Sequence, residues 1–100
     1  MRAVKLRYAR RARTDINGIH EYISDHDRRA ASAVVRRIRS ASQLLAKYPG
    51  LGRATDMAGV RVFPIVPFPY LIYYRVTNDA LEVIHVRHGR RDVPKPDELV

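Results

Sequence analysis

One hundred residues, 46% of them hydrophobic, are enough for a single domain with a real but modest core. The chain has no cysteine, which excludes a disulfide framework and a thiolate metal site. Its longest stretch without a charged residue, 62–74, is too short and too interrupted by proline to span a bilayer. The N-terminus begins with charged residues and has no apolar signal segment, so we expect a cytoplasmic protein without a membrane partner.

The formal net charge of +9 is concentrated in the first half of the chain. Residues 1–50 contain 12 Lys or Arg and 4 Asp or Glu, whereas residues 51–100 contain 7 and 6. A basic field of this kind attracts nucleic acid or an acidic protein. The plainer alternative is a solvated helix face that keeps the protein soluble, and composition leaves both open.

The first half of the chain predicts a strand followed by two helices. Residues 3–8 alternate apolar and basic, as in a half-buried strand. Residues 9–24 carry one apolar stripe at spacings of four, three and four, which indicates a helix. Asp27 is a good N-cap for a second helix that runs to about residue 48 and is ended by Pro49 and Gly50. The short connection makes these helices an antiparallel hairpin.

The second half predicts a loop and then a three-stranded antiparallel meander. Residues 49–59 are expected to form the loop, and residues 61–66, 70–76 and 81–91 the strands. The middle strand is apolar on both faces, which suits a central position. Pro64 lacks an N–H group, so the first strand is expected either to be an edge strand or to turn the free side of Pro64 outward. Asn78 and Asp79 fit a two-residue hairpin loop because both residue types tolerate a positive φ.

These elements define an α+β domain of order β-α-α-β-β-β. The helical hairpin needs an apolar surface to cover, and one face of a mostly antiparallel sheet supplies it. We expect residues 1–92 to form this single domain and residues 93–100 to be a loose tail.

No metal or cofactor site is predicted from the sequence. His85 and His88 are three residues apart on one predicted strand and therefore point to opposite faces. Phosphate-binding loops, dinucleotide fingerprints and nucleophile elbows are absent. His88 is conceivable as a general acid or base, but a polar side chain at the rim of the sheet is the plainer interpretation.

Arginine and tyrosine are interleaved on the predicted meander. The residues concerned are Arg61, Arg75, Arg87, Arg90 and Arg91, with Tyr70, Tyr73 and Tyr74. Such a surface is compatible with RNA stacking. It is equally compatible with the ordinary use of Tyr in strands and of Arg at strand edges.

A set of short motifs, in order, resembles the RelE/ParE superfamily of toxins. They are Ala12-x-x-Asp15-Ile16-x-x-Ile19-x-x-Tyr22-Ile23, Pro49-x-x-Gly52-Arg53, Val60-Arg61, Tyr70-x-Ile72-x-Tyr74-Arg75-Val76 and Val83-Ile84-x-Val86-x-His88-Gly-x-Arg91. The resemblance covers about residues 3–92. It implies the β-α-α-β-β-β fold and the toxin half of a bacterial type II toxin–antitoxin, or plasmid-stabilisation, pair.

The resemblance implies two possible activities. RelE-like toxins cut mRNA on the ribosome without a metal, and the residues available for this here would be Arg61, Arg75, His88 and Arg90. ParE-like toxins inhibit DNA gyrase instead. Leu71 stands where the nuclease branch usually has a mid-sheet Arg, and Tyr74-Arg75-Val76 looks more like the ParE branch, which we therefore favour. The target-binding residues would then be His88, Arg90 and Arg91.

The resemblance also implies an antitoxin partner with a segment that wraps the toxin. The basic first half of the chain predicts that this segment is acidic. Its expected contacts are the arginines of the second helix, namely Arg28, Arg29, Arg36, Arg37 and Arg39. A free-standing RNA-binding module with no protein partner is the alternative from another functional class.

Overall fold

Two helices pack on one face of a five-stranded sheet in this computed structural model, which describes residues 4–89. The chain runs through β1 (Lys5–Tyr8), α1 (Arg10–Ser24) and α2 (Arg28–Lys47), then a short 3-10 turn η1 (Pro49–Leu51). It continues through β2 (Arg53–Ala54), β3 (Val60–Pro64), β4 (Tyr70–Val76) and β5 (Ala80–His88). No described helix is long and apolar enough to cross a membrane.

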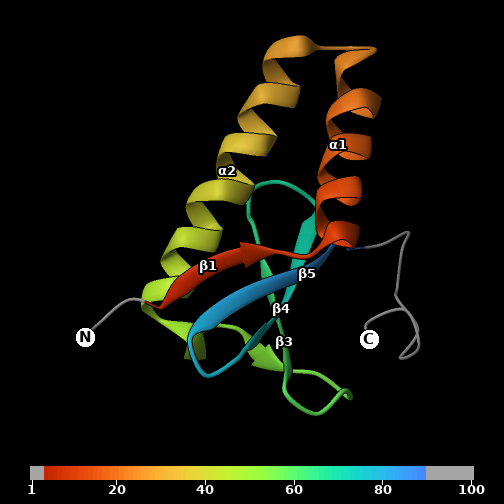
Figure 1. Cartoon of the computed structure of the whole chain (residues 1–100). Helices are drawn as coiled ribbons and strands as arrows, with labels where there is room; N and C mark the ends of the chain where they lie inside the picture. Colours follow the sequence, from red (N-terminus) through yellow and green to blue (C-terminus); the bar gives the residue numbers. More distant parts are fainter. Residues whose placement is uncertain (1–3, 90–100) are drawn as a thin grey trace.

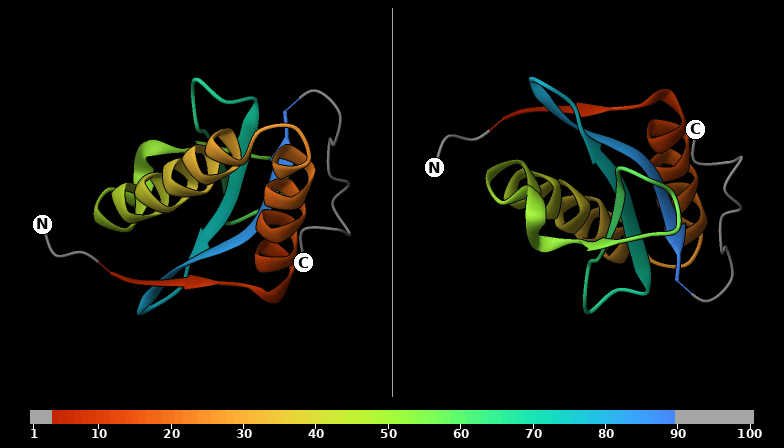
Figure 2. Two further views of the ribbon diagram at one scale, coloured as in Figure 1. Left: turned by 90° about the horizontal axis from the view of Figure 1, so that it is seen from above. Right: turned by 90° about the horizontal axis from the view of Figure 1, so that it is seen from below.

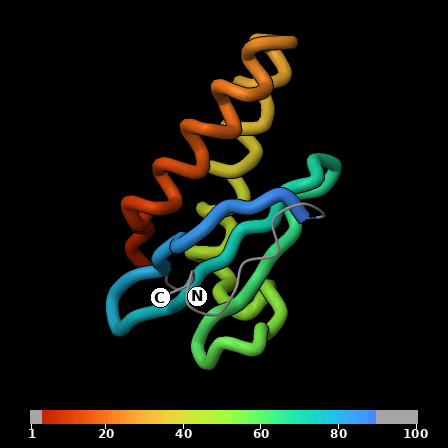
Figure 3. The backbone as a smooth tube through the Cα atoms, turned by 90° about the vertical axis from the view of Figure 1, so that its right-hand side faces the viewer, coloured from red at the N-terminus to blue at the C-terminus, as the bar shows by residue number. Residues whose placement is uncertain are grey.

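The α+β class, the element order and the helical hairpin on one face are confirmed. The hairpin covers one side of the sheet and leaves the other open (Figure 2). Its loop end projects beyond the sheet, as the side view also shows (Figures 1 and 3). The predicted boundary at residue 92 and the tail at 93–100 lie outside the described residues.

The helices are held by the apolar stripes that the sequence predicts. In α2 the residues spaced three or four apart are all buried, namely Ala31, Val34, Ile38, Ala41 and Leu45. Val35 and Leu44, which widen this stripe, are half-buried and exposed, respectively. Asp27 caps the helix by accepting hydrogen bonds from the Arg29 and Ala30 N–H groups. The stripe of α1 buries Ala12 completely and packs its three isoleucines against the same core. Tyr74, Ile38, Leu45 and Ile72 are among the largest side chains of this helix–sheet core.

The strand order β1-β5-β4-β3-β2 puts β4 at the centre, as predicted. It also joins β1 to β5 in parallel. The helices carry the chain from β1 to β2 at the opposite edge, and the antiparallel strands β3, β4 and β5 lead it back beside β1. The prediction of an unbroken loop at 49–59 is wrong. β2 forms there and pairs with Arg61 and Val62, so β3 is not an edge strand. Pro64 itself has no partner on β2, which agrees with the other expectation for this proline.

The two-residue loop predicted between β4 and β5 is confirmed, but without the positive φ expected of it. The loop at Asn78 and Asp79 has two residues, but no described non-glycine residue has a positive φ; Thr77 closes this turn by backbone and hydroxyl bonds to Ala80. Val76, the last residue of β4, is 46% exposed. An irregularity in the β4–β5 pairing after Tyr73 changes the register toward that end of the sheet.

Candidate functional site

Arg61, a predicted nuclease residue, supports the fold. It is paired across strands with Tyr74, whose side chain is fully buried in the helix–sheet core. Its guanidinium donates a hydrogen bond to the Gly52 carbonyl. The Tyr74 hydroxyl donates to the Pro49 carbonyl at 2.7 Å and accepts from the Gly52 N–H at 2.9 Å. Together these bonds fix the chain that leads into β2.

Arg75 lies on the opposite face of β4 and is bound to a carboxylate. Its Nε and Nη2 both lie 2.9 Å from Oε1 of Glu82, the residue opposite it on β5. Arg61 and Arg75 therefore do not converge on a common point, although they are close in the register of the sheet. Successive residues around Tyr74 face opposite sides of a pleated strand.

His88 lies at the other end of β4, where it is paired with Tyr70. Their rings meet edge to face with centroids 5.5 Å apart. Both line a cleft of about 340 Å³ between α1 and the end of β5, which Tyr22 and Gly18 also border. Four strand residues, or about 13 Å, separate this position from Tyr74 and Arg61. Arg90 and Arg91 lie outside the described residues.

The open face of the sheet carries a row of polar side chains that sequence reasoning missed. Cross-strand pairing connects Arg53 to Val62, Val62 to Tyr73 and Tyr73 to His85. Directly opposed residues on neighbouring strands share a face, so Arg53, Tyr73 and His85 form one row. Burial raises the pKa of the Tyr73 phenol, against the opposing effect of the positive charges of Arg53 and Arg87. The four residues Arg53, Tyr73, His85 and Arg87 are the open-face row from here on.

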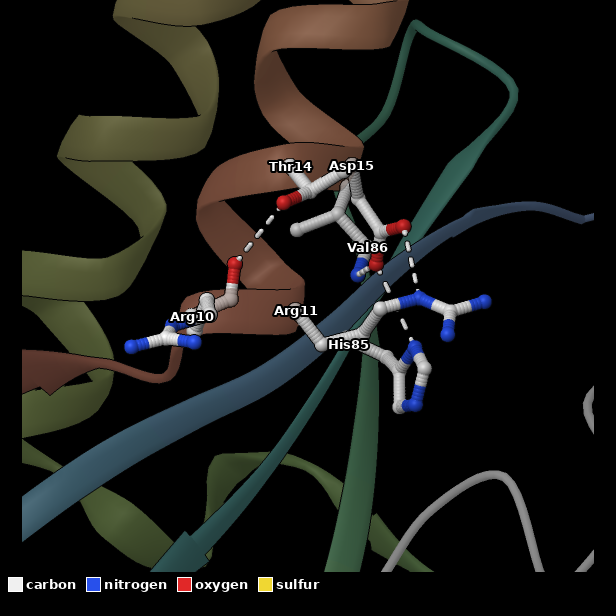
Figure 4. A network of polar contacts seen from close by, with 6 residues as sticks. All are labelled: Arg10, Arg11, Thr14, Asp15, His85 and Val86. Atoms are coloured by element: carbon white, nitrogen blue, oxygen red, sulfur yellow. Dashed lines mark hydrogen bonds and ion pairs between the residues drawn. The ribbon is translucent and has the colours of Figure 1, made fainter.

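Asp15 of α1 anchors this row at the edge of β5 (Figure 4). β1 pairs with β5 only as far as Val83, and Asp15 takes over where β1 has ended. Its Oδ2 accepts the Val86 N–H at 3.1 Å and lies 3.2 Å from Nδ1 of His85. A carboxylate oxygen accepts hydrogen bonds, so Nδ1 is the protonated nitrogen in this contact. Asp15 thus fixes the ring of the buried His85.

The five arginines predicted to bind an antitoxin do not form one cluster. Arg28 and Arg29 are exposed in the first turn of α2, at the projecting end of the hairpin (Figure 1). Arg36, Arg37 and Arg39 lie further along, around a shallow hollow that reaches Phe68. Arg37 also donates from Nε to the Val66 carbonyl at 3.1 Å.

The residues that sequence reasoning missed depend on strand register. Arg53 was predicted to lie in a loop, and only the pairing of β2 with β3 brings it onto the sheet. Asp15 is part of the quoted motif, but nothing in its spacing indicates that it meets β5. The predicted opposite placement of His85 and His88 agrees with their partners, Tyr73 and Tyr70. Residues 4–89 contain no group of three side chains suited to a metal ion.

Comparison with known proteins decides the family. A model described as the ParE toxin of the type II toxin–antitoxin system, parDE, matches residues 6–93. The chain belongs to the ParE toxin family. It is 34% identical over 91 residues to Y4kP of Sinorhizobium fredii, which is named as a toxin, covering 91% of this chain and 94% of that protein. It is 35% identical over 81 residues to toxin RelE2 of Caulobacter vibrioides, covering 81% and 90% respectively.

A solved structure supports the fold. A chain of the chromosomal ParDE toxin–antitoxin system from P. aeruginosa superposes with a TM-score of 0.76 at 21% identity, covering 86% of this chain and 96% of that one. The RelE/ParE resemblance predicted from the motifs is therefore confirmed. This chain is the toxin component of a type II toxin–antitoxin pair, and its family implies a cognate antitoxin.

Proposed function

We propose that this toxin arrests growth in the cytoplasm by inhibiting DNA gyrase and that an acidic antitoxin neutralises it. The observation that carries the proposal is the dispersal of the residues available for a RelE-like reaction. Arg61 is bound to the Gly52 carbonyl, and Arg75 is bound to Glu82. His88, paired with Tyr70, lies about 13 Å along the sheet from Arg61 and about 17 Å from Arg75.

A RelE-like reaction depends on where its charged groups and its proton-transfer group lie. Metal-independent cleavage of RNA needs a cation at the scissile phosphate and a group within reach that moves a proton. Arg61 and Arg75 face opposite sides of the sheet and are each held by another group. Leu71 shares the face of Arg75 but lies four residues away along β4 and carries no charge. Inhibition of gyrase requires only a docking surface.

The candidate docking surface is the end of β5. His88 and Tyr70 form an aromatic wall of the cleft beside α1, and Arg90 and Arg91 follow directly in the sequence. A basic and aromatic surface suits a target that handles DNA.

Two assays on the purified toxin test this proposal. We expect inhibition of plasmid supercoiling by gyrase and no codon-linked cuts in mRNA in a translating extract. His88→Ala should weaken the inhibition, whereas His20→Ala, on the exposed face of α1, should not. Thermal melting of both variants checks that the fold is kept. Cuts in the mRNA with supercoiling untouched would overturn the gyrase assignment.

The open-face row supports a second candidate function, cleavage of mRNA. Arg53 and Arg87 both act on Tyr73 through their charge, and the raised pKa of Tyr73 keeps its phenol protonated and able to donate a proton near neutral pH. If the open-face row cleaves mRNA, Tyr73→Phe and Arg53→Ala should each abolish cleavage. mRNA that stays intact in the presence of the wild-type toxin, or cleavage that both variants retain, would reject the second function.

A further inference from the structure

The cleft between α1 and the end of β5 has aromatic side chains on both of its sides. Its volume is about 340 Å³, within the range of sites that hold a small ligand. Tyr22 lines it from α1 and is 59% exposed. Tyr70 and His88 line it from the sheet, where their rings meet edge to face. A flat ligand can therefore contact aromatic surface from the helix side and from the sheet side.

Gly18 lines the same cleft, and packing does not account for it. It lies in the middle of the 15-residue helix α1, where glycine is the least favourable residue apart from proline. A Cβ added at Gly18 would meet nothing beyond its own stretch of helix within 4 Å. The missing side chain instead keeps the cleft open between Thr14 and Tyr22, which lie one turn before and one turn after it.

The polar groups of the cleft suit an anionic ligand with hydrogen-bond donors. Arg87 lines it, and the carboxylate of Asp15 lies 3.5 Å from the guanidinium of Arg11. One carboxylate thus stands against two guanidinium groups. The Thr14 hydroxyl donates to a carbonyl one turn earlier in α1, and its oxygen remains an acceptor. The cleft combines aromatic surface, a guanidinium and acceptor oxygens.

These groups correspond to the parts of one nucleotide. A base stacks on aromatic side chains, a phosphate pairs with a guanidinium, and the amino edge of a base donates to acceptor oxygens. A base inside a duplex is already stacked and paired, so only an unpaired one can enter a pocket. We propose that the cleft binds an unpaired nucleotide, with its base between Tyr22 and the Tyr70–His88 pair and its phosphate at Arg87. The inference deepens the proposed function, because this surface is the candidate docking site for gyrase, whose substrate is DNA.

Fluorescence anisotropy with a short labelled oligodeoxyadenosine strand tests the ligand class. We expect the purified toxin to bind this strand about 5-fold or more tightly than an abasic strand of the same length, because stacking of one base contributes that much. It should also bind the strand more tightly than the same sequence in a duplex. Charge attraction alone predicts the reverse, because a duplex has the higher charge density. Equal or tighter binding of the duplex or of the abasic strand overturns the proposal.

Deoxyadenosine monophosphate distinguishes a free nucleotide from a nucleotide within a strand. Displacement of the labelled strand by an equal concentration of the monophosphate would identify a free nucleotide as the ligand. Displacement only by a large excess would identify a strand, because neighbouring phosphates then add to the affinity. Either result supports the cleft as a nucleotide site.

Gly18→Leu tests the location, and His20→Leu is its matched control. His20 lies on the same helix about 200° further round and does not line the cleft. Gly18→Leu should fill the cleft and weaken binding of the strand by about 10-fold or more. Its melting temperature should equal or exceed that of wild type, because leucine favours the helix. His20→Leu should bind as wild type does. Unchanged affinity in Gly18→Leu, or equal losses in both variants, overturns the site.

Two variants of Tyr22 test the stacking contact. Tyr22→Ala should weaken binding of the strand by about 5-fold or more, whereas Tyr22→Phe keeps the aromatic face and should stay within about 2-fold of wild type. Equal losses in the two variants would contradict stacking. If the wild-type toxin inhibits gyrase but binds no strand, the nucleotide site is overturned and the proposed function stands. If it binds the strand without inhibiting gyrase, the site stands and the proposed function fails.

Discussion

Tyr74 connects the helix–sheet core to residues Pro49 and Gly52, which lead into β2 at the edge of the sheet. Its hydroxyl satisfies both the Pro49 carbonyl and the Gly52 N–H, while its ring is fully buried. Gly52 has no room for a side chain, because an added Cβ would lie 2.7 Å from Cε1 of Tyr74. This fit explains why glycine and tyrosine stand at these two positions.

Replacing Tyr74 by Phe should lower the free energy of unfolding by about 1–3 kcal/mol, because the buried Gly52 N–H and the partly buried Pro49 carbonyl lose their partner. Urea denaturation measures this, with Tyr22→Phe as control because Tyr22 is 59% exposed. An unfolding free energy equal to that of wild type would show that water replaces both bonds.

The same residue makes a prediction about pH. Burial raises the pKa of Tyr74 above its ordinary value of 10.0, although the Gly52 hydrogen bond and the charge of Arg61 act in the opposite direction. The stabilisation from its neutral phenol is present in full below about pH 10 and is lost as the pH rises through the raised pKa. The Phe variant should lack this alkaline contribution.

Asp15, like Tyr74, stabilises the fold by joining segments that are distant in the sequence, here α1 and β5. Asp15→Ala should lower the free energy of unfolding by about 1–3 kcal/mol, because the Val86 N–H loses its acceptor. Asp15→Asn keeps a carbonyl oxygen at the same place and should stay close to wild type. Equal losses in the two variants would mean that charge, through Arg11 or His85, matters more than the hydrogen bond.

At the scale of elements, α2 depends on its first turn. Asp27 accepts the N–H groups of Arg29 and Ala30 at 3.0 and 3.1 Å. Asp27→Ala should cost about 1 kcal/mol. That corresponds to a melting temperature lower by about 4–8 °C in a domain of this size. Asp25→Ala, two residues earlier and exposed, is the control, and equal shifts in both variants would contradict the capping role.

Sequence reasoning predicted the elements well where their pattern is local. Helix stripes, the Asp27 cap and the prolines between β3 and β4 are all readable within a few residues. β2 was missed because two residues are too few to show alternation, and they pair only after β3 is in place. The register change after Tyr73 was missed because pairing with β5 determines it.

For the whole molecule, the sequence predicted the family and the layer arrangement but not the site. The motifs are spread along residues 12–91, so their order carries the resemblance. Which arginines share a face depends on tertiary pairing. Arg61 is held by a carbonyl nine residues away, and Arg53 joins Tyr73 only through β3. Both relations depend on β2, which the sequence did not indicate.

The central claim is that toxicity acts through DNA topology. It is tested most directly by inducing the toxin without its antitoxin and resolving the topoisomers of a reporter plasmid as growth stops. We predict that growth stops and that negative supercoiling is lost at the same time, with reporter mRNA still intact, and that co-expression of the antitoxin reverses both effects. Growth arrest with unchanged topoisomers and mRNA cut at codon boundaries would contradict the account and transfer the activity to the open-face row.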